Sequence, residues 1–378
     1  MSDPAKASRG LYAIDLLRFA AAFMVMAYHY LCSFALDHDP DLGTILPRTL
    51  PTSAASWALD GWVGVEIFFV ISGYVIAMSA QGAGVGDFVQ RRVERLVPAA
   101  WVCGTITALA LLLMAVNPTF IAPRWINSML FIPKEAQIDG SYWTLGIETS
   151  FYALTALIIM TARGRERLGQ LAIGLGLYCA LFWLVLQPLS GLGGGQFLER
   201  KYQLMLVTQG AFFALGMVLQ RCAARGWTWR WQVYGALLLY LCALSLDAHC
   251  QERALRLARA VPLDAPLLMF LLGVLIMGAA HRLQPLLARH MNGRAVQTLG
   301  LMTYPLYLLH HTLGAVLIAA LMHAGSGYYP AVLMIMTLMI AAAWAIVRYA
   351  EPLVKAQIRR AIQALRLALT HARPVLAQ

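Results

Sequence analysis

Charged residues are scarce in this chain. Asp, Glu, Lys and Arg make up 12% of its 378 residues, whereas hydrophobic residues make up 60%. Soluble domains carry about twice that charged fraction. Apolar runs long enough to cross a bilayer as a helix recur along the whole sequence. This composition excludes an ordinary soluble domain and predicts an all-α polytopic membrane protein, with the lipid bilayer as a partner.

The chain also lacks the short motifs of several enzyme classes. It contains no glycine-rich phosphate loop, no HExxH and no GxSxG. Its six cysteines are scattered rather than paired as in a zinc site, although Cys32 and Cys250 could form a disulfide if both face the outer side. His310 and His311 are adjacent, which does not suit two ligands on one helix face. We therefore expect no metal site.

The formal net charge of +11 has a simple explanation. A strongly basic protein can bind nucleic acid, but this chain has no soluble basic domain to carry that function. Its Lys and Arg residues cluster instead in turns on one side of the predicted membrane, as the positive-inside rule expects. We expect no nucleic-acid partner.

Ten apolar runs predict ten membrane spans around a central polar channel. They lie near residues 11–31, 57–80, 96–116, 141–162, 168–188, 202–220, 231–248, 264–280, 296–322 and 330–350. The turns after the even-numbered spans are rich in arginine, and the first outer loop is acidic, with Asp37, Asp39, Asp41 and Asp60 against Arg48. We therefore expect a multi-pass protein of the inner (cytoplasmic) membrane with both termini in the cytoplasm.

We divide the chain into a cytoplasmic N-terminal segment (residues 1–10), a transmembrane domain (11–353) and a basic cytoplasmic tail (354–378). Asp15 and Arg18 interrupt the first apolar run, so we expect an uncleaved first span rather than a signal peptide. Residues 358–369 predict an amphipathic helix on the inner surface. Arg253, Arg256 and Arg259 fall on the predicted outer side, against the charge rule, and indicate a short surface helix there.

Two ionisable residues in the first span indicate a function inside the membrane. Ten residues separate Arg18 from His29, so eleven helical steps of about 100° bring them to nearly one face, about 16 Å apart. Such groups persist at membrane depth mostly where they face a wet cavity and act there. A neutral imidazole is a suitable general base, and Arg18 could hold a phosphate or a thioester carbonyl. Asp15, one turn earlier, would partly neutralise Arg18.

The second span adds polar and small residues. Glu66 is a further charge within the membrane, and Ser72 can form a hydrogen bond to another helix. Gly61, Gly64 and Gly73 would let neighbouring helices approach closely, which explains them without any other function.

The arginines after the second span, Arg91, Arg92 and Arg95, have two interpretations. They could clamp the phosphates of a nucleotide-like cofactor, or they could serve only to orient the chain. In the fourth span, Glu148 shares a helix face with Tyr152. A carboxylate there would pair with a buried cation or orient a histidine.

Aromatic and histidine residues complete the list of candidates. Tyr142 and Trp143 begin the fourth span and suit a membrane interface. In the ninth span Pro305 should kink the helix. We expect only His310, and not His311, to face the centre of the bundle.

Six segments of the chain together resemble a known family. They are Arg18-x10-His29, FFVISGYVI (Phe68 to Ile76), RRVERLVP (Arg91 to Pro98), YWTLGIE (Tyr142 to Glu148), TYPLYLLH (Thr303 to His310) and Glu351-Pro352. Each is weak alone, but in this order, over residues 11–353, they resemble the acyltransferase-3 family of bacterial membrane-bound O-acyltransferases.

The resemblance implies an activity and assigns residues to it. Such proteins move an acyl group, usually acetyl, from cytoplasmic acyl-coenzyme A to a sugar hydroxyl of an exported or cell-surface glycan. His29, Arg18 and Glu148 would be catalytic, and Arg91, Arg92, Arg95 and Arg18 would bind the donor. Asp15, Glu66, Ser72, Tyr142, Trp143, Tyr152 and His310 would line the channel. The donor is a substrate, so we expect no permanently bound cofactor.

Several points stay open at this stage. Many relatives carry a fused extracytoplasmic hydrolase-like domain, which this sequence does not contain, and we expect direct transfer within the membrane domain. The acceptor could instead be a small glycoside or antibiotic, the acyl group could be succinyl, and a covalent acyl-enzyme could precede transfer. A secondary transporter would also carry Arg, His and Glu in its helices, but we find no clear inverted repeat.

Overall fold

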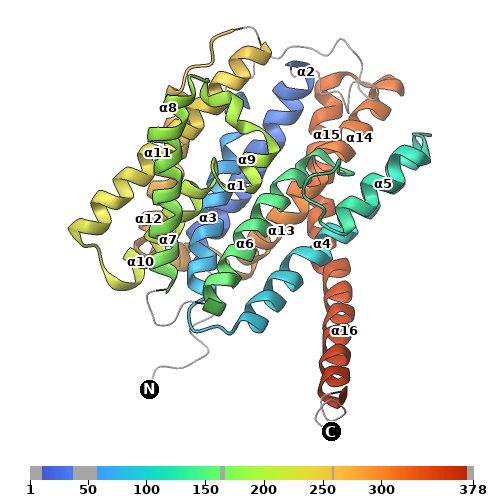
Figure 1. Cartoon of the computed structure of the whole chain (residues 1–378). Coiled ribbons are helices and arrows are strands. Elements are labelled where there is room, and N and C mark those ends of the chain that lie inside the picture. The colour runs from blue at the N-terminus through green and yellow to red at the C-terminus, as the bar shows by residue number, and fades with distance from the viewer. Residues whose placement is uncertain (1–10, 37–57, 162–166, 258, 373–378) are drawn as a thin grey trace.

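The computed structural model describes residues 11–36, 58–161, 167–257 and 259–372. Every regular element within these ranges is a helix (Figure 1), which confirms the all-α prediction. Among the residues used above to orient the chain, Asp37, Asp39, Asp41 and Arg48 lie outside the described residues.

The α-helices have the following bounds. They are α1 Tyr12–Tyr28, α2 Phe34–Leu36, α3 Val63–Ser79, α4 Val85–Leu113, α5 Pro118–Met129, α6 Trp143–Thr161, α7 Arg167–Leu181, α8 Gln187–Ser190, α9 Arg200–Leu204, α10 Gly210–Arg225, α11 Trp229–Leu257, α12 Asp264–His290, α13 Gly293–Leu309, α14 Thr312–His323, α15 Tyr328–Ala345 and α16 Glu351–Ala372.

Within the described residues, seven helical segments are long and apolar enough to cross a membrane, and the bent pair α13–α14 raises the number to eight. Each of the ten predicted spans coincides with a helix, but α3 and α10 contain only 17 and 16 residues. Helices of that length are about 25 Å long, against roughly 30 Å for the hydrocarbon core of a bilayer. The multi-pass architecture is confirmed, and the predicted ten spans include these two short helices.

Helices α1, α3 and α10 form the middle of the bundle. α3 packs against α10 and α1, and α1 also packs against α12 and α13. The predicted close approach is confirmed, because a Cβ added at Gly61, Gly64 or Gly73 would lie within 2.5 Å of a backbone carbonyl oxygen of α1 or α10. On the outside, residues such as Leu113 and Leu333 are 88% and 69% exposed, as expected of side chains that face lipid.

Several predicted spans are not continuous α-helices, and two of the interruptions lie beside histidines. α1 ends at Tyr28 and continues as a π-helix, η2 His29–Ser33. The ninth span divides into α13 and α14, whose axes differ by 68°. The break falls at His310–His311, five residues after Pro305, which lies inside α13. Both irregular turns occur beside the histidines that the sequence singled out, and π-turns are frequent at functional sites.

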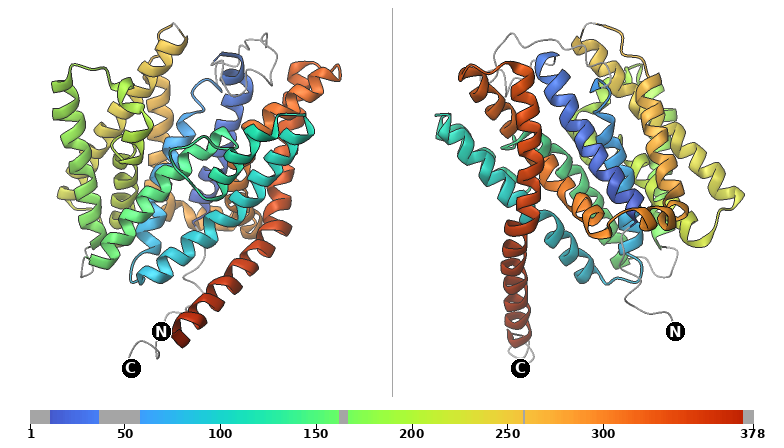
Figure 2. Two further views of the ribbon diagram at one scale, coloured as in Figure 1. Left: turned by 45° about the vertical axis from the view of Figure 1, so that its right-hand side comes forward. Right: turned by 180° about the vertical axis from the view of Figure 1, so that it is seen from behind.

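Three basic segments also differ from the prediction. Arg91, Arg92 and Arg95 lie within α4 rather than in a turn. α11 continues to Leu257 and includes Arg253 and Arg256, so the separate outer surface helix is wrong. The tail is helical as expected, but α16 continues the last span through a π-helix, η7 Ile346–Ala350, and projects beyond the bundle in both views of Figure 2.

Candidate active site

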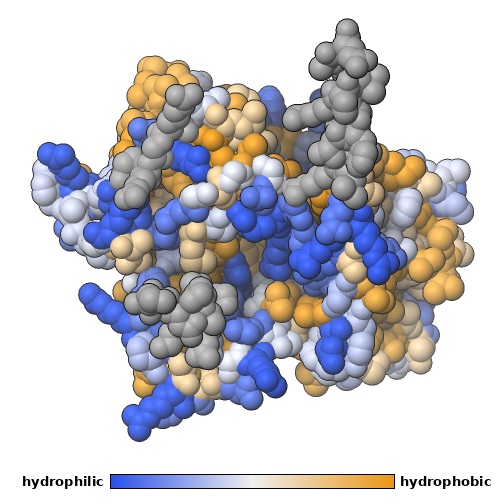
Figure 3. Space-filling model, turned by 90° about the horizontal axis from the view of Figure 1, so that it is seen from below, coloured by the Kyte–Doolittle hydropathy of each residue, from blue (hydrophilic) through white to orange (hydrophobic). Residues whose placement is uncertain are grey.

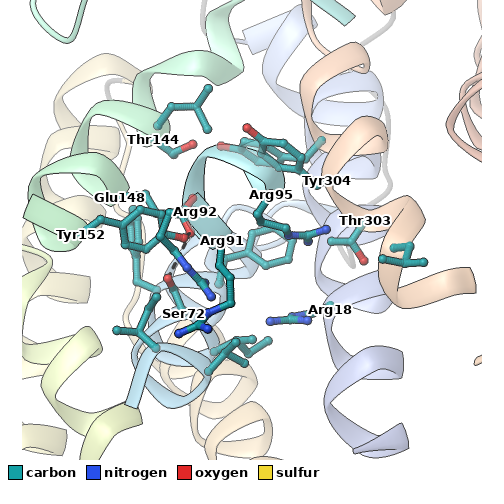
Figure 4. Close-up of a pocket in the computed structure, with 18 of the residues that line it drawn as sticks. Arg18, Ser72, Arg91, Arg92, Arg95, Thr144, Glu148, Tyr152, Thr303 and Tyr304 are labelled. Atoms are coloured by element: carbon teal, nitrogen blue, oxygen red, sulfur yellow. Dashed lines mark hydrogen bonds between the residues drawn. The ribbon is translucent and has the colours of Figure 1, made fainter. Parts of the chain in front are cut away.

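A basic cavity of about 420 Å³ lies at the end of the bundle from which α16 projects. We call it the arginine cavity, and its charged residues are Arg18, Arg91, Arg92, Glu94, Arg95, Glu148, Lys355 and Arg359. Figure 4 shows Arg18 reaching from α1 toward the arginines of α4. Six cations against two carboxylates give this cavity an excess of positive charge, which attracts anions.

Contacts within the cavity hold the α4 arginines in place. Arg91 donates a hydrogen bond to the backbone oxygen of Ser79 at 3.2 Å, and Arg92 donates to the Ser79 hydroxyl at the same distance. The Arg95 guanidinium lies 5.4 Å from the centre of the Tyr304 ring. Because a guanidinium has five N–H donors, each of these contacts fixes the group and leaves it able to bind phosphate.

Glu148 connects α6 to α3 inside this cavity. Its Oε1 accepts hydrogen bonds from the Ser72 hydroxyl, at 3.1 Å, and from the hydroxyl of Tyr152 one turn further along α6. The shared face predicted for Glu148 and Tyr152 is confirmed, and Ser72 joins them from a helix 76 residues away in the chain. The carboxylate is therefore a fixed acceptor among the arginines.

The contribution of α16 to this cavity was not predicted from the sequence. Lys355 and Arg359 line the arginine cavity, and Arg359 donates to Glu94 Oε2 from Nη2 at 2.7 Å and from Nε at 3.0 Å. Figure 3, which looks at the molecule from this end, shows hydrophilic residues gathered across the middle of the face. Basic residues four positions apart, directly after the last span, were the signal that could have found them.

A second cavity, also of about 420 Å³, lies further along the same helices. We call it the histidine cavity, and its ionisable residues are His29, Glu66, His249, Glu252, Arg253, Arg256 and His311, with Tyr28, Trp62, Trp143 and Tyr307 as its aromatic lining. Arg18 and His29 therefore line different cavities. In place of the one predicted polar channel, the structure has two cavities that share two lining residues, Val65 and Tyr307.

The hydrogen bonds of His29 indicate which of its two ring nitrogens carries the proton. His310 Nδ1 lies 2.7 Å from the backbone oxygen of Tyr307, so a neutral His310 carries its proton on Nδ1 and accepts at Nε2. That Nε2 is 3.0 Å from His29 Nδ1, which is also 2.9 Å from the backbone oxygen of Val25. His29 Nδ1 must then carry the proton that both acceptors share. The lone pair of His29 is left on Nε2, the arrangement that a general base requires.

The expected roles of the two adjacent histidines are partly reversed. His310 is fully buried behind His29 and lines neither cavity, whereas His311 lines the histidine cavity with its ring centre 4.7 Å from that of His29. The prediction that only His310 faces the centre is therefore wrong. The reason is the break at this point, because residues on either side of it no longer follow one helical periodicity.

Asp139 stabilises the break between α13 and α14, a role that was not predicted from the sequence. Its Oδ2 accepts from the backbone N–H of Thr312 at 2.8 Å, and its Oδ1 accepts from the backbone N–H and hydroxyl of Ser141. Asp139 is fully buried, and an unpaired amide at that depth would be costly. A Cβ added to Gly140 would lie 2.6 Å from the His311 ring, so this position needs glycine.

Residues of α11 and of the start of α3 line the histidine cavity together with His29. His249 Nε2 lies 3.2 Å from Glu66 Oε1, and both side chains are buried. The Arg253 guanidinium stacks on the Trp62 ring at 4.0 Å. His249 was missed, and Arg253 was assigned to a surface helix, because both lie beyond the apolar run that predicted the seventh span. Their spacing of four indicates one helix face.

Besides His310, two further predicted channel residues line neither cavity, Asp15 and Tyr142. Asp15 is 3.7 Å from Arg18, which confirms the expected pairing. Tyr142 is buried in the core, with its hydroxyl donating to the backbone oxygen of Ala100 at 2.8 Å, rather than at a membrane interface. All six cysteines are free, so Cys32 and Cys250 form no disulfide. Among the described residues, no group of three or more His, Cys, Asp or Glu is arranged to hold a metal ion.

Comparison with protein families identifies the chain. The model of the acyltransferase domain of the acyltransferase-3 type matches residues 11–348, nearly the whole sequence. The chain belongs to the acyltransferase-3 family. No solved structure matches it.

Several relatives of this acyltransferase-3 protein have names that describe glycan or O-acetyl chemistry. Exopolysaccharide production protein ExoZ of Rhizobium meliloti is 30% identical over 32% of this chain and 40% of its own length. Peptidoglycan O-acetyltransferase OatA of Listeria monocytogenes is 26% identical over 46% of this chain and 29% of its own length. Nodulation protein 10 of Rhizobium leguminosarum bv. viciae is 27% identical over 80% of this chain and 83% of its own length. The chain thus spans less than half the length of the first two.

Proposed function

We propose that this protein is a membrane-bound O-acyltransferase that moves an acyl group, acetyl in the first instance, from acyl-coenzyme A to a sugar hydroxyl of an exported or cell-surface glycan. One observation carries the proposal. A histidine whose Nε2 holds a lone pair lines one cavity, and that cavity meets a second, strongly basic cavity at Val65 and Tyr307. Family membership supports the reaction class, and the names of the relatives support a glycan acceptor.

The arginine cavity suits the donor. Coenzyme A carries phosphates, which guanidinium groups bind through paired hydrogen bonds. Arg91, Arg92 and Arg95 would bind these phosphates together with Lys355 and Arg359 of α16, and Arg18 lies deeper, on α1. The basic residues of α4 and α16 favour a cytoplasmic location for this end, in the inner membrane.

The histidine cavity suits the acceptor and the proton transfer. His29 Nε2 takes the proton of the acceptor hydroxyl, and the hydroxyl oxygen attacks the thioester carbonyl carbon. The tetrahedral intermediate collapses, the carbon–sulfur bond breaks, and the leaving thiolate of coenzyme A receives that proton from His29. Aromatic rings lie beside charged side chains here, as Trp62 does beside Arg253. The rings would pack on the apolar face of a sugar, and the charged groups would form hydrogen bonds with its hydroxyls.

A deletion strain tests the proposal directly. Surface glycans of the strain and its parent are compared by mass spectrometry, and the deletion is expected to lose the increment of one acyl group from a defined sugar. Complementation with the wild-type gene should restore it, and His29→Ala should not. Identical glycans in the two strains, with a changed small glycoside instead, would favour the alternative acceptor.

Transport is the candidate function of a different class. Transport requires one route through the membrane that a solute can follow. The two cavities here are lined by different kinds of side chain and share only two lining residues, Val65 and Tyr307. Uptake of labelled sugar into sealed vesicles without acyl-coenzyme A would contradict the acyltransferase proposal.

A further inference from the structure

Tyr30 follows His29 in the chain and connects the two segments that carry the pair His29–His310. It is fully buried, and its hydroxyl donates a hydrogen bond to the backbone oxygen of His310 at 2.7 Å. In a continuous helix that oxygen would accept from the backbone N–H of Gly314. At the bend between α13 and α14 it accepts from the Tyr30 hydroxyl. Two successive residues of the π-turn, His29 and Tyr30, therefore contact the same residue, one at its ring and the other at its backbone.

Tyr30 is itself held in place on several sides. A Cβ added to Gly314 would lie 1.9 Å from the Tyr30 hydroxyl oxygen, so a glycine at this position is what leaves room for the hydroxyl. The backbone oxygen of Tyr30 accepts from the hydroxyl of Tyr328, at the start of α15. Its ring packs beside that of Phe34, with ring centres 5.5 Å apart. Both the side chain and the backbone of Tyr30 therefore have fixed partners.

Resting on the proposed function, we propose that Tyr30 is a positioning residue for the general base. Two constraints place His310 Nε2 at 3.0 Å from His29 Nδ1. The hydrogen bond from His310 Nδ1 to the backbone oxygen of Tyr307 orients the His310 ring relative to its own helix. The hydrogen bond from Tyr30 ties the His310 backbone to the turn that carries His29, and it thereby sets the distance between the two rings.

This distance determines which tautomer of His29 is favoured. A separation of about 3.6 Å is no longer a hydrogen bond, so a shift of roughly half an ångström is enough to lose the contact. His29 Nδ1 would then keep the Val25 backbone oxygen as its acceptor and lose His310. The tautomer with the proton on Nε2 becomes more populated as a result, and it has no lone pair there to accept a proton. Because Tyr30 lines neither cavity, its effect on transfer passes through His310.

A double-mutant cycle tests the proposal. Wild type, Tyr30→Phe, His310→Ala and the double variant are assayed in lipid nanodiscs, with acetyl-coenzyme A as donor and a glycan extract of the deletion strain as acceptor. Tyr30→Phe keeps the ring and should lower kcat by roughly three- to tenfold, the scale of one neutral hydrogen bond. KM for the donor should stay unchanged, because the arginine cavity is intact. In the His310→Ala background the same substitution should cause no further loss, since the ring that Tyr30 positions is absent.

The cycle distinguishes positioning from a purely structural role. His310→Ala removes the imidazole and keeps the backbone oxygen to which Tyr30 donates. A structural contribution of the hydroxyl would therefore persist in that background, and Tyr30→Phe would lower kcat there by the same factor. An equal loss in both backgrounds would overturn the positioning role.

Two further variants complete the experiment. Tyr74→Phe is the matched control, because Tyr74 is as deeply buried as Tyr30, its hydroxyl lies 3.0 Å from His281 Nε2, and it lines neither cavity. It should keep the wild-type kcat. Tyr328→Phe removes the hydrogen bond to the Tyr30 backbone and should lower kcat by a smaller factor, again only where His310 is present. It carries the test alone if Tyr30→Phe does not accumulate in the membrane.

The results separate the two proposals. An unchanged kcat in an accumulated Tyr30→Phe protein would overturn this inference and leave the acyltransferase function intact. Failure of the wild-type protein to acylate the extract from either acetyl- or succinyl-coenzyme A would instead overturn the proposed function, and this inference with it.

Discussion

The arginine cavity and the histidine cavity enclose the same volume, about 420 Å³ each, and share four helices, yet they differ in chemistry. The first collects guanidinium and ammonium groups, which keep their charge and fix the position of an anion. The second collects imidazoles and carboxylates, together with Arg253 and Arg256. Under the proposed function, donor binding and proton transfer are separated along the helices, so a substitution in one cavity should damage one of them and leave the other intact.

The largest effect on the rate of transfer is expected for His29, the proposed general base. His29→Ala should lower kcat by about 10²- to 10⁴-fold, the usual contribution of a general base, with donor binding unchanged because the arginine cavity is intact. Acyl transfer and calorimetric binding of coenzyme A, measured on the same preparation, check this. His323→Ala, a histidine on α14 that lines neither cavity, is the control. Full activity of His29→Ala would remove the base assignment.

The reciprocal substitution lies in the other cavity. Arg92→Ala should raise KM for acyl-coenzyme A by roughly 10- to 100-fold, since a hydrogen bond to a charged group contributes about 1.5–3 kcal/mol, with a smaller change in kcat. Initial rates over a range of donor concentrations measure both constants. Arg230→Ala, at the start of α11 and outside both cavities, should behave as wild type. A fall in kcat with unchanged KM would contradict the separation.

His310 tests the role of the histidine cavity further, because under the proposed function it affects transfer only by orienting His29. His310→Ala removes the acceptor that holds the Nδ1 proton of His29, and should lower kcat by roughly tenfold, the scale of one lost hydrogen bond. KM for the donor should stay unchanged. His310→Gln supplies a new acceptor oxygen and should recover part of the loss. Equal activity of the Ala and Gln variants would contradict a positioning role and indicate a packing effect alone.

The smallest effect is expected at the open end of the arginine cavity. Arg359 is 60% exposed, and exposed charge pairs contribute about 0.2–1 kcal/mol, so Arg359→Ala should raise KM for the donor by roughly two- to fivefold. The neighbouring Arg360→Ala removes the same charge from a position that does not line the cavity. Identical KM values for the two variants would show that only net charge matters here.

The sequence predicts the position of a site residue well where the periodicity of its own helix determines which way the side chain faces. Arg18, Ser72, Glu148, Tyr152 and the α4 arginines meet in one cavity as expected, because helical periodicity sets the face of each. The division into two cavities was not predictable in this way. It depends on which side chains of α3 and α13 meet, and no pattern within one helix carries that information.

Irregular backbone limited the prediction further. The tight turn at His310–His311 and the π-turn at His29 are stabilised by contacts between distant segments, such as Asp139 with Thr312 and Tyr30 with the backbone oxygen of His310. A local sequence pattern favours a straight helix at both places. The roles of His310 and His311 were therefore assigned from a periodicity that the chain does not keep.

The contact between Asp139 and Thr312 has a consequence for biogenesis. The carboxylate that satisfies the amide at the bend precedes it by 173 residues, so it enters the membrane long before α13 and α14 are synthesised. The last helices can reach their final angle only after docking against an earlier half that is already in place. A C-terminal fragment beginning at α13 would insert with this amide unsatisfied, and we expect it to be cleared by the quality-control proteases of the cell.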